Sequence, residues 1–251
     1  MVFSGKTDIG RLRPHNEDCL GSYVSDDGNT LLLVVADGMG GRNAGEVASK
    51  MLVDLFMEKA PFLNKADLTI EQLQEFLSDT IKEANVVIGR EAEKNEEKMG
   101  MGTTAVACIL RDGKLITANV GDSRAYISEK SRLVRVTRDH SYVEALVQQG
   151  AISEAQARIH PDKNIITRAV GCMDKIDVDT FVKEFEKDSV LLMCSDGLTN
   201  MVEDDYLQRL IRRNKNMDKL SDRLVSVAKK NGGSDNITVI VARRNEEVVH
   251  G

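Results

Sequence analysis

Short apolar runs recur along this chain with the length and composition of β-strands. They are rich in Val, Ile, Leu and Thr, which favour extended backbone. The pattern predicts strands over residues 2–8, 31–36, 103–110, 114–120, 124–128, 177–183, 189–194 and 237–242. We therefore expect a fold with a large proportion of β-structure.

Other segments carry apolar residues at steps of three and four, which places them on one face of a helix. Asn43 and Glu46 resemble a capping box at the start of one such segment. The apolar stripes are interpreted as core packing, the usual role of such a face. The periodicity predicts helices over residues 43–59, 70–97, 204–213 and 218–229.

The order of these elements points to a layered fold. Strands occur in groups and do not alternate one for one with helices, which favours an antiparallel fold over a doubly wound parallel sheet. Helices outside two packed sheets would bury every apolar stripe. We therefore predict an α+β fold, a four-layer αββα sandwich of two antiparallel β-sheets flanked by antiparallel helix pairs. With three prolines in the chain and no Pro/Gly/Ser-rich linker, a single domain over residues 1–251 is expected.

The segment from 139 to 171 is an irregular excursion from this order. Ser141 with Glu144, and Ser153 with Gln156, match the capping-box pattern, so two short helices are expected here. Insertions of this kind next to a functional site often tune access and substrate choice.

Composition and charge exclude several classes of function. The net charge of −6, without a basic block, argues against a nucleic-acid partner. No apolar run reaches the ~18 residues of a membrane span and the first residues lack the apolar stretch of a signal peptide, so a cytoplasmic protein without a membrane partner is expected. The four scattered cysteines are interpreted as reduced, forming neither disulfides nor a zinc site.

Acidic residues occur repeatedly at the ends of apolar runs. Asp37, Asp122, Asp196 and Asp235 each lie at or next to such an end and are followed by Gly, Ser or Asn. One Asp-Gly pair is usually only a turn. A set of strand ends on one edge of a sandwich would converge, however, and the carboxylates would repel one another unless cations lay among them. Oxygen ligands without a Cys or His cluster favour hard ions such as Mg²⁺ or Mn²⁺.

A pair of such ions suits phosphate chemistry. Two ions about 3.5–4 Å apart can activate a water for in-line attack on a phosphate, and they would also let an acidic pocket attract an anion. The glycine-rich loop after Asp37 does not fit a nucleotide site, because G-x-G-x-x-G would need glycine at Asn43. No cysteine is followed six residues later by arginine, and no histidine follows an asparagine, so cysteine-nucleophile and calcineurin-like phosphatases are not supported. The DVDTF stretch at 177–181 only approaches an aspartyl-phosphate motif and is interpreted as a strand.

Eight motifs carry a family resemblance over nearly the whole chain. In order between Arg13 and Val241 they are RPHNED, VVADGMGG, GTTAV, ANVGDSRAY, TRDHS, ITRAVG, CSDGL and SDNITVIV. Together they resemble the metal-dependent protein phosphatases of type 2C, the PPM class, and within it the bacterial serine/threonine phosphatase branch. Members of this branch reverse phosphorylation by serine/threonine kinases.

The resemblance implies a set of metal ligands. Asp37 would bridge two Mn²⁺ or Mg²⁺ ions, with the Gly38 carbonyl on one of them. Asp196 and Asp235 would complete the other. Asp122, with Asp196, would form a third and weaker site.

The resemblance also implies roles outside that direct ligand set. Glu17 and Asp18, adjacent just before a short strand-like piece, would hold metal-bound waters. Arg13 would grip the substrate phosphate with its forked donors. Many eukaryotic relatives have histidine as a candidate proton donor where this chain has Met39, and some bacterial relatives have one where it has Arg42, so the proton donor is unassigned.

The implied activity is hydrolysis of phosphoserine and phosphothreonine by direct attack of a metal-activated water, without a covalent intermediate. The implied partners are phosphorylated proteins, including a serine/threonine kinase, and a monomer is expected. The segment 139–171 would be the flap beside the active site, with Gly102, Thr103 and Thr104 as scaffold and Asn236 fixing the Asp235 loop. Two alternatives stay open: a catalytically silent module on the same fold, which loss of a ligand would reveal, and a metal-dependent phosphatase of small molecules.

Overall fold

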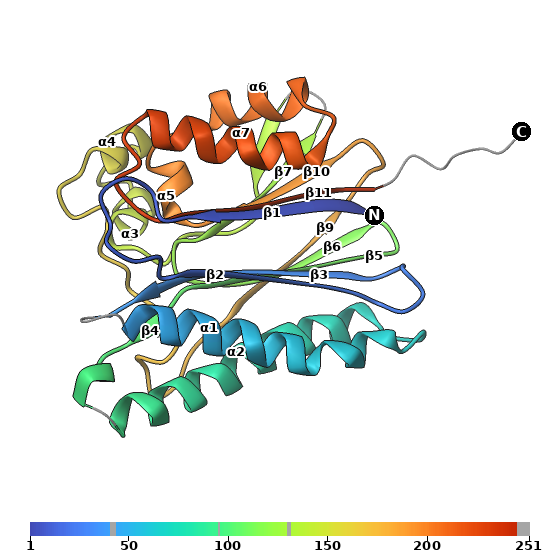
Figure 1. Cartoon of the computed structure of the whole chain (residues 1–251), viewed down its shortest axis with the longest axis horizontal. Coiled ribbons are helices and arrows are strands. Elements are labelled where there is room, and N and C mark those ends of the chain that lie inside the picture. The colour runs from blue at the N-terminus through green and yellow to red at the C-terminus, as the bar shows by residue number, and fades with distance from the viewer. Residues whose placement is uncertain (41–43, 95, 130–131, 245–251) are drawn as a thin grey trace, which may run out of the picture.

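The computed structural model describes residues 1–40, 44–94, 96–129 and 132–244, which form four layers (Figure 1). Two β-sheets face each other in the middle. Helices α6 (Asp204–Arg213) and α7 (Met217–Lys230) cover one sheet, and α1 (Ala44–Lys59) and α2 (Ile70–Glu93) cover the other. The αββα sandwich predicted from the order of elements is confirmed.

The sheet beneath α6 and α7 has five antiparallel strands in the order β1-β11-β10-β7-β8. Their bounds are β1 Val2–Asp8, β7 Arg124–Glu129, β8 Arg132–Arg135, β10 Val190–Cys194 and β11 Ile237–Arg243. Val2 lies opposite Arg243 and Asp8 opposite Ile237. The segment that follows β1 therefore lies beside the loop that precedes β11.

The sheet beneath α1 and α2 has six antiparallel strands in the order β2-β3-β5-β6-β9, with β4 paired to β3. Their bounds are β2 Asp18–Val24, β3 Leu31–Met39, β4 Gly102–Thr103, β5 Ala105–Arg111, β6 Lys114–Val120 and β9 Asp179–Glu184. In the β2–β3 ladder Asp18 lies directly opposite Asp37.

Five short helical segments join these elements. They are the 3₁₀ helices η1 (Ala60–Asn64) and η2 (Glu96–Lys98), and the helices α3 (Tyr142–Gln148), α4 (Glu154–Arg158) and α5 (Asp196–Thr199). The Ser141 hydroxyl accepts from the Glu144 N–H at the start of α3, and Ser153 and Gln156 make both bonds of a capping box at the start of α4. The two short helices expected within residues 139–171 are therefore confirmed. The capping box predicted at Asn43 lies outside the described residues.

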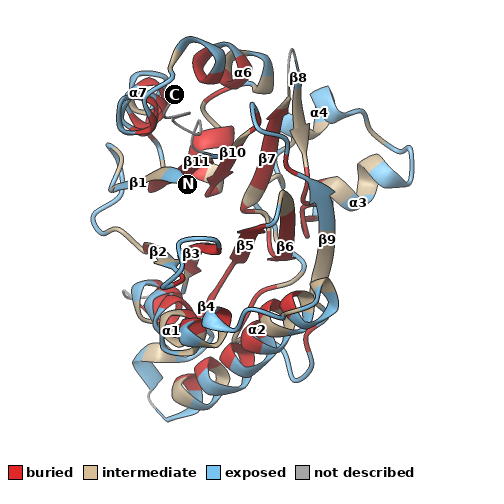
Figure 2. Cartoon of the chain, turned by 90° about the vertical axis from the view of Figure 1, so that its right-hand side faces the viewer, coloured by how far each residue is buried: buried red, intermediate tan, exposed pale blue. Residues whose placement is uncertain are grey.

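The continuous apolar run before Asp37 is explained by burial of β3 on both faces. Leu31, Leu33 and Val35 belong to the core between the two sheets, and Leu32 and Val34 to the core beneath α1 and α2. A third core joins α6 and α7 to their sheet. Figure 2 shows the buried residues along these interior layers and the exposed ones on the outer helix faces.

β8 is missing from the sequence prediction, and β2 is indicated only as a short strand-like piece after Glu17 and Asp18. In β2, Gly21 interrupts the pattern because α1 packs so close that a Cβ there would lie 2.7 Å from Val53 Cγ1. β8 is a four-residue edge strand, RLVR, with only two apolar residues. The predicted helix over 70–97 was also too long, since α2 ends at Glu93. No helix among the described residues is long and apolar enough to cross a membrane.

Candidate metal centre

The centre of the site is the pair Asp18 and Asp37. Because they lie opposite each other in an antiparallel ladder, their side chains project from the same face of the sheet. Asp18 is 8% exposed, and its Oδ2 accepts from Ser195 Oγ at 2.8 Å. Its Oδ1 is buried without a hydrogen-bond partner among the described residues. An unpaired carboxylate oxygen at this depth is costly unless a cation or water completes it.

Two threonines hold the end of β3 that carries Asp37. Thr104 donates its N–H to the Asp37 carbonyl at 2.9 Å and accepts from the Asp37 N–H at Oγ1 at 3.0 Å. Thr103 Oγ1 donates to the same carbonyl at 3.1 Å. The backbone of Asp37 is therefore fixed while its carboxylate stays available, which agrees with the scaffold role expected of this segment.

The glycines after Asp37 allow β3 and α1 to approach closely. A Cβ on Gly38 would lie 2.1 Å from the Gly45 carbonyl oxygen and 2.6 Å from that of Glu17. The Gly45 N–H, at the start of α1, donates to the Glu17 carboxylate. Glu17 thus lies at the positive end of the α1 dipole, a favourable place for an anion. Met39 ends β3 and is half-buried, and Arg42 lies outside the described residues.

The first and last strands bring Arg13 and Asp235 together. The Arg13 guanidinium donates to Asp235 Oδ2 at 2.8 Å. Asn236 fixes the surrounding loops: its Oδ1 accepts from the Glu17 N–H at 2.8 Å, and its Nδ2 donates to the carbonyls of Ile9 and His15. The role expected of Asn236 in fixing this loop is consistent with these contacts.

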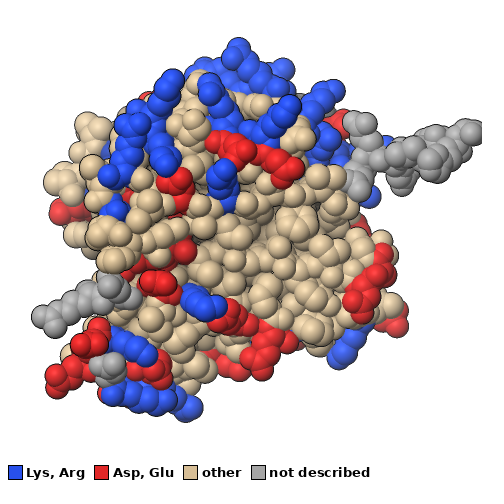
Figure 3. Space-filling model, viewed as in Figure 1, with Lys and Arg blue, Asp and Glu red and all other residues tan. Residues whose placement is uncertain are grey.

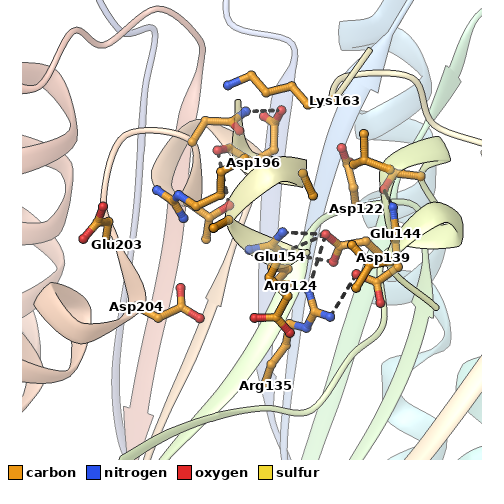
Figure 4. A pocket seen from close by; sticks show the side chains of 18 of the residues that line it. Asp122, Arg124, Arg135, Asp139, Glu144, Glu154, Lys163, Asp196, Glu203 and Asp204 are labelled. Atoms are coloured by element: carbon orange, nitrogen blue, oxygen red, sulfur yellow. Dashed lines mark hydrogen bonds and ion pairs between the residues drawn. The ribbon is translucent and has the colours of Figure 1, made fainter. Parts of the chain in front are cut away.

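Asp122 and Asp196 come from the ends of β6 and β10 and line a cavity of about 460 Å³ beneath α3 and α4 (Figure 4). Asn200 Nδ2 donates to Asp196 Oδ2 at 2.8 Å. Deeper in the cavity, Arg124 makes a bidentate contact with Asp139, its shortest distance being 2.6 Å from Nη2 to Oδ2. Arg135 links Asp139 to Glu144 of α3, so the segment 139–171 is tied by ion pairs to the strands beside the cavity.

The carboxylates perturb one another strongly. Burial, followed by the charge of Asp196, raises the pKa of Asp122 to about 8, and burial raises the pKa of Asp18 to about 7. Burial and the charge of Asp235 raise the pKa of Asp196 to about 6. The pKa of Asp37 is raised well above its usual value by burial and then by the neighbouring aspartates. Asp37, Asp122 and Asp196 keep some exposed surface, which fits a cluster on the floor of an open cleft.

This donor set suits hard divalent cations. The cluster offers oxygen ligands only, its charges destabilise one another, and Asp18 Oδ1 lacks a partner. Among the described residues no three His, Cys, Asp or Glu side chains are arranged as a finished metal site. Three of the carboxylates instead accept hydrogen bonds from protein donors: Asp235 from Arg13, Asp196 from Asn200 and Asp18 from Ser195.

The structure gathers all the acidic residues expected at the site, and it adds residues that the sequence did not single out. Ser195 is fully buried and links Asp18 to the Thr238 N–H. Arg124 and Asp139 form an ion pair, and the charges of both act on Asp122. Arg124 and Asp139 stand in two of the motifs, so their position was a signal, although no role followed from it.

Comparison with known proteins gives consistent matches over most of the chain. The family model of protein phosphatase 2C matches residues 11–239. The chain is 43% identical over 240 residues to the serine/threonine phosphatase stp of Listeria monocytogenes, which covers 96% of this chain and 94% of that protein.

Solved structures agree in fold. The serine/threonine phosphatase Stp1 from Staphylococcus aureus superimposes with a TM-score of 0.89 at 37% identity, covering 97% of this chain and 95% of that one. The catalytic domain of the phosphatase PstP, solved with two manganese ions, gives a TM-score of 0.82 at 29% identity and covers 96% of both chains.

Proposed function

Because this chain belongs to the protein phosphatase 2C family and is a metal-dependent serine/threonine protein phosphatase, we propose that the cluster around Asp18 and Asp37 is its catalytic centre. The observation that carries the proposal is the convergence of buried and partly buried aspartates from four separate parts of the chain beside one arginine. The proposed reaction is hydrolysis of phosphoserine and phosphothreonine in proteins by direct attack of water.

Asp37 is the proposed bridging ligand between two Mn²⁺ or Mg²⁺ ions, because it interacts with every other aspartate of the cluster. The Gly38 carbonyl would share one ion, and Asp196 and Asp235 would hold the other. Asp122, across the cavity from the flap segment, is proposed for a third ion with Asp196. When bound, two such cations supply a water of lowered pKa and positive charge for the phosphate oxygens.

Asp18 and Glu17 are proposed to order water at the centre. Asp18 Oδ1 is buried and has no hydrogen-bond partner among the described residues, so it is the oxygen proposed to accept from a water. Ser195 holds the other oxygen, Oδ2. Glu17 is held by the Gly45 N–H at the start of α1.

Arg13 is the proposed phosphate-binding residue. Its side chain is 48% exposed, and the bond to Asp235 uses one of the five N–H donors of a guanidinium. The others are free to form the forked contacts that suit two oxygens of a phosphate. Met39 has no proton to give to the leaving alcohol, so the proton donor is a different group.

The proposed substrates are phosphorylated proteins, and a serine/threonine kinase would be the opposing enzyme. The segment 139–171, which carries α3 and α4 and lines the cavity, is proposed to act as the flap of one domain, and the enzyme to act as a monomer.

The test is hydrolysis of a phosphothreonine peptide with Mn²⁺ and after exhaustive chelation, in parallel with a small phosphomonoester. We expect metal-dependent turnover with a higher kcat/KM for the peptide. Activity that survives full removal of metal would refute the proposed centre. A preference for the small ester would instead favour the small-molecule alternative.

A further inference from the structure

The two helical layers of the sandwich carry opposite charge. Helices α1 and α2 contain nine acidic and four basic residues, whereas α6 and α7 contain four acidic and seven basic ones. Figure 3 shows the result, with Lys and Arg gathered over the upper layer and both signs mixed over the lower one. The net charge of −6 therefore conceals a basic face.

The exposed cations on this face follow the helical repeat. Arg209, Arg212 and Arg213 form one stripe on α6, and Lys219, Arg223 and Lys230 form one on α7, with all six side chains exposed. We call these six residues, with Lys215 between the helices, the basic face. The ion pairs that α6 and α7 make among the described residues are Lys6–Asp222 and Lys229–Asp8, and neither involves the basic face. Arg209 lies over the Tyr206 ring, 5.3 Å from its centroid, and keeps its charge exposed.

The helix dipole explains only part of this pattern. Basic residues in the last turn of a helix are favourable, which accounts for Arg212, Arg213 and Lys230. Lys219 lies near the N-terminus of α7, where the dipole disfavours a cation, and Arg209 and Arg223 lie away from the helix ends. These positions call for a different explanation.

We propose that the basic face binds the surface of an anionic lipid membrane. α6 and α7 lie side by side as one outer layer, and α7 is about 21 Å long at 1.5 Å per residue, so the cations spread over an area and do not converge on one point. None of the large exposed apolar side chains among the described residues belongs to α6 or α7. A stable protein interface usually has an apolar core, whereas a polybasic face is enough for a charged lipid surface.

The acidic layer does not oppose this binding. It lies behind two β-sheets, about 30 Å away at about 10 Å per layer. That is several times the Debye length of about 8 Å at physiological ionic strength. The membrane therefore interacts mainly with the local charge of the basic face. The expectation of no membrane partner rested on the missing apolar span and the missing apolar stretch of a signal peptide, and neither bears on binding of a charged face to a lipid surface.

Docking in this orientation leaves the catalytic centre open. The ends of β3 and β4 and the start of α5, which carry the site, lie toward the left edge in Figure 1, inward of the outer surface of α6 and α7. The bound enzyme would present its cleft along the membrane plane.

The test is co-sedimentation with vesicles of phosphatidylcholine alone and of equal parts phosphatidylcholine and phosphatidylglycerol. A variant with Arg209→Gln, Arg212→Gln, Lys219→Gln and Arg223→Gln is compared with a control in which Lys50, Lys82, Arg90 and Lys94 of the opposite layer become Gln. Both lose four charges, and circular dichroism and turnover of a small phosphomonoester confirm that both are folded.

We expect the unmodified protein and the control to bind the anionic vesicles, binding to fall about tenfold or more in the basic-face variant, and added salt to weaken it. Equal binding to both kinds of vesicle, or an equal loss in the control, would overturn the proposal. Retention on immobilised polyglutamate without vesicle binding would overturn it and would indicate that the basic face binds an acidic protein. Salt-sensitive self-association that is lost in the basic-face variant and kept in the control would overturn it in favour of a second copy of the chain.

Discussion

The Arg13 guanidinium and the Asp235 carboxylate form an ion pair of 2.8 Å between residues 222 positions apart in the chain. The proposed phosphate-binding group and a proposed metal ligand are thus in direct contact. Because both side chains keep contact with solvent, the pair contributes little to the free energy of unfolding and can open at low cost.

Replacing Arg13 by alanine should impair catalysis with little effect on the fold. We expect kcat/KM on a phosphothreonine peptide to fall about 10- to 100-fold, the cost of losing a charged hydrogen bond to the phosphate. Thermal unfolding should shift little. Arg11→Ala, at an exposed arginine two residues earlier, is the matched control and should keep normal kinetics. Equal losses in both variants would argue against a special role for Arg13.

Asp37→Asn should abolish turnover, a loss of about 10²-fold or more, because it removes the negative charge of the carboxylate proposed to bridge both metal ions. The variant should stay folded and should lose the stabilisation by Mn²⁺ that is expected in thermal unfolding of the unmodified protein. Asp235→Asn should behave in the same way. A folded variant with normal rates and normal Mn²⁺ stabilisation would refute the ligand assignment.

Without metal, the protein should lose stability as pH rises from about 4 to about 8. The pKa values of Asp196, Asp18 and Asp122 are raised to about 6, 7 and 8, so over this range the native state binds more protons than the unfolded state. The lowered pKa of His140, caused mainly by burial, acts in the opposite direction but is one group against three. Thermal unfolding in EDTA across this range would measure the slope, and Mn²⁺ should flatten it. A midpoint that rises steadily with pH in EDTA would contradict this assignment.

His140→Ala should destabilise the fold by about 1–3 kcal/mol. His140 is buried, its Nδ1 accepts from the Gly121 N–H at 3.1 Å, and its Nε2 lies 3.3 Å from Asp179 Oδ2. The substitution leaves that N–H without its partner one residue before Asp122. Urea unfolding provides the measurement, with His160→Ala, at a partly exposed histidine of the same segment, as the control. If the free energies of unfolding of the two variants are equal, the contacts of His140 do not stabilise the fold as predicted.

Gly38→Ala should damage the centre, because the added Cβ would overlap the Gly45 carbonyl oxygen at 2.1 Å. Since the nearby carbonyl oxygens of Gly45 and Glu17 are both backbone atoms, β3 and α1 would have to move apart. We expect loss of activity and weaker Mn²⁺ stabilisation. Gly28→Ala is a poor control because its φ is positive, but Ser22→Ala, on the exposed side of β2, should be neutral. Normal activity in Gly38→Ala would show that this close approach is not required.

The sequence predicted the layers well because each element follows a clear rule. β3 reads as a continuous apolar run since it is buried on both faces, and the helices show stripes since they are buried on one. β2 is indicated only as a short strand-like piece because a close helix contact selects Gly21 within it. β8 is missed because an exposed edge admits arginines. Local patterns do not record such contacts between distant segments.

The same limit applies to the site. The aspartates were identifiable because each follows or precedes an apolar run, and the motifs supplied their order. The role of Ser195 depends on Asp18, which is 177 positions away, and the charge separation between the helical layers depends on which residues share a face. Neither can be read from local sequence.

The pairing of β1 with β11 has a consequence for the protein during its synthesis. Arg13 follows β1 and Asp235 precedes β11, so the ribosome must synthesise the chain past Asp235, 222 positions after Arg13, before these two residues can meet. A nascent or prematurely terminated polypeptide would hold most of the aspartates and still lack a working centre. Phosphatase activity would then begin only after β11 has been translated and has paired with β1.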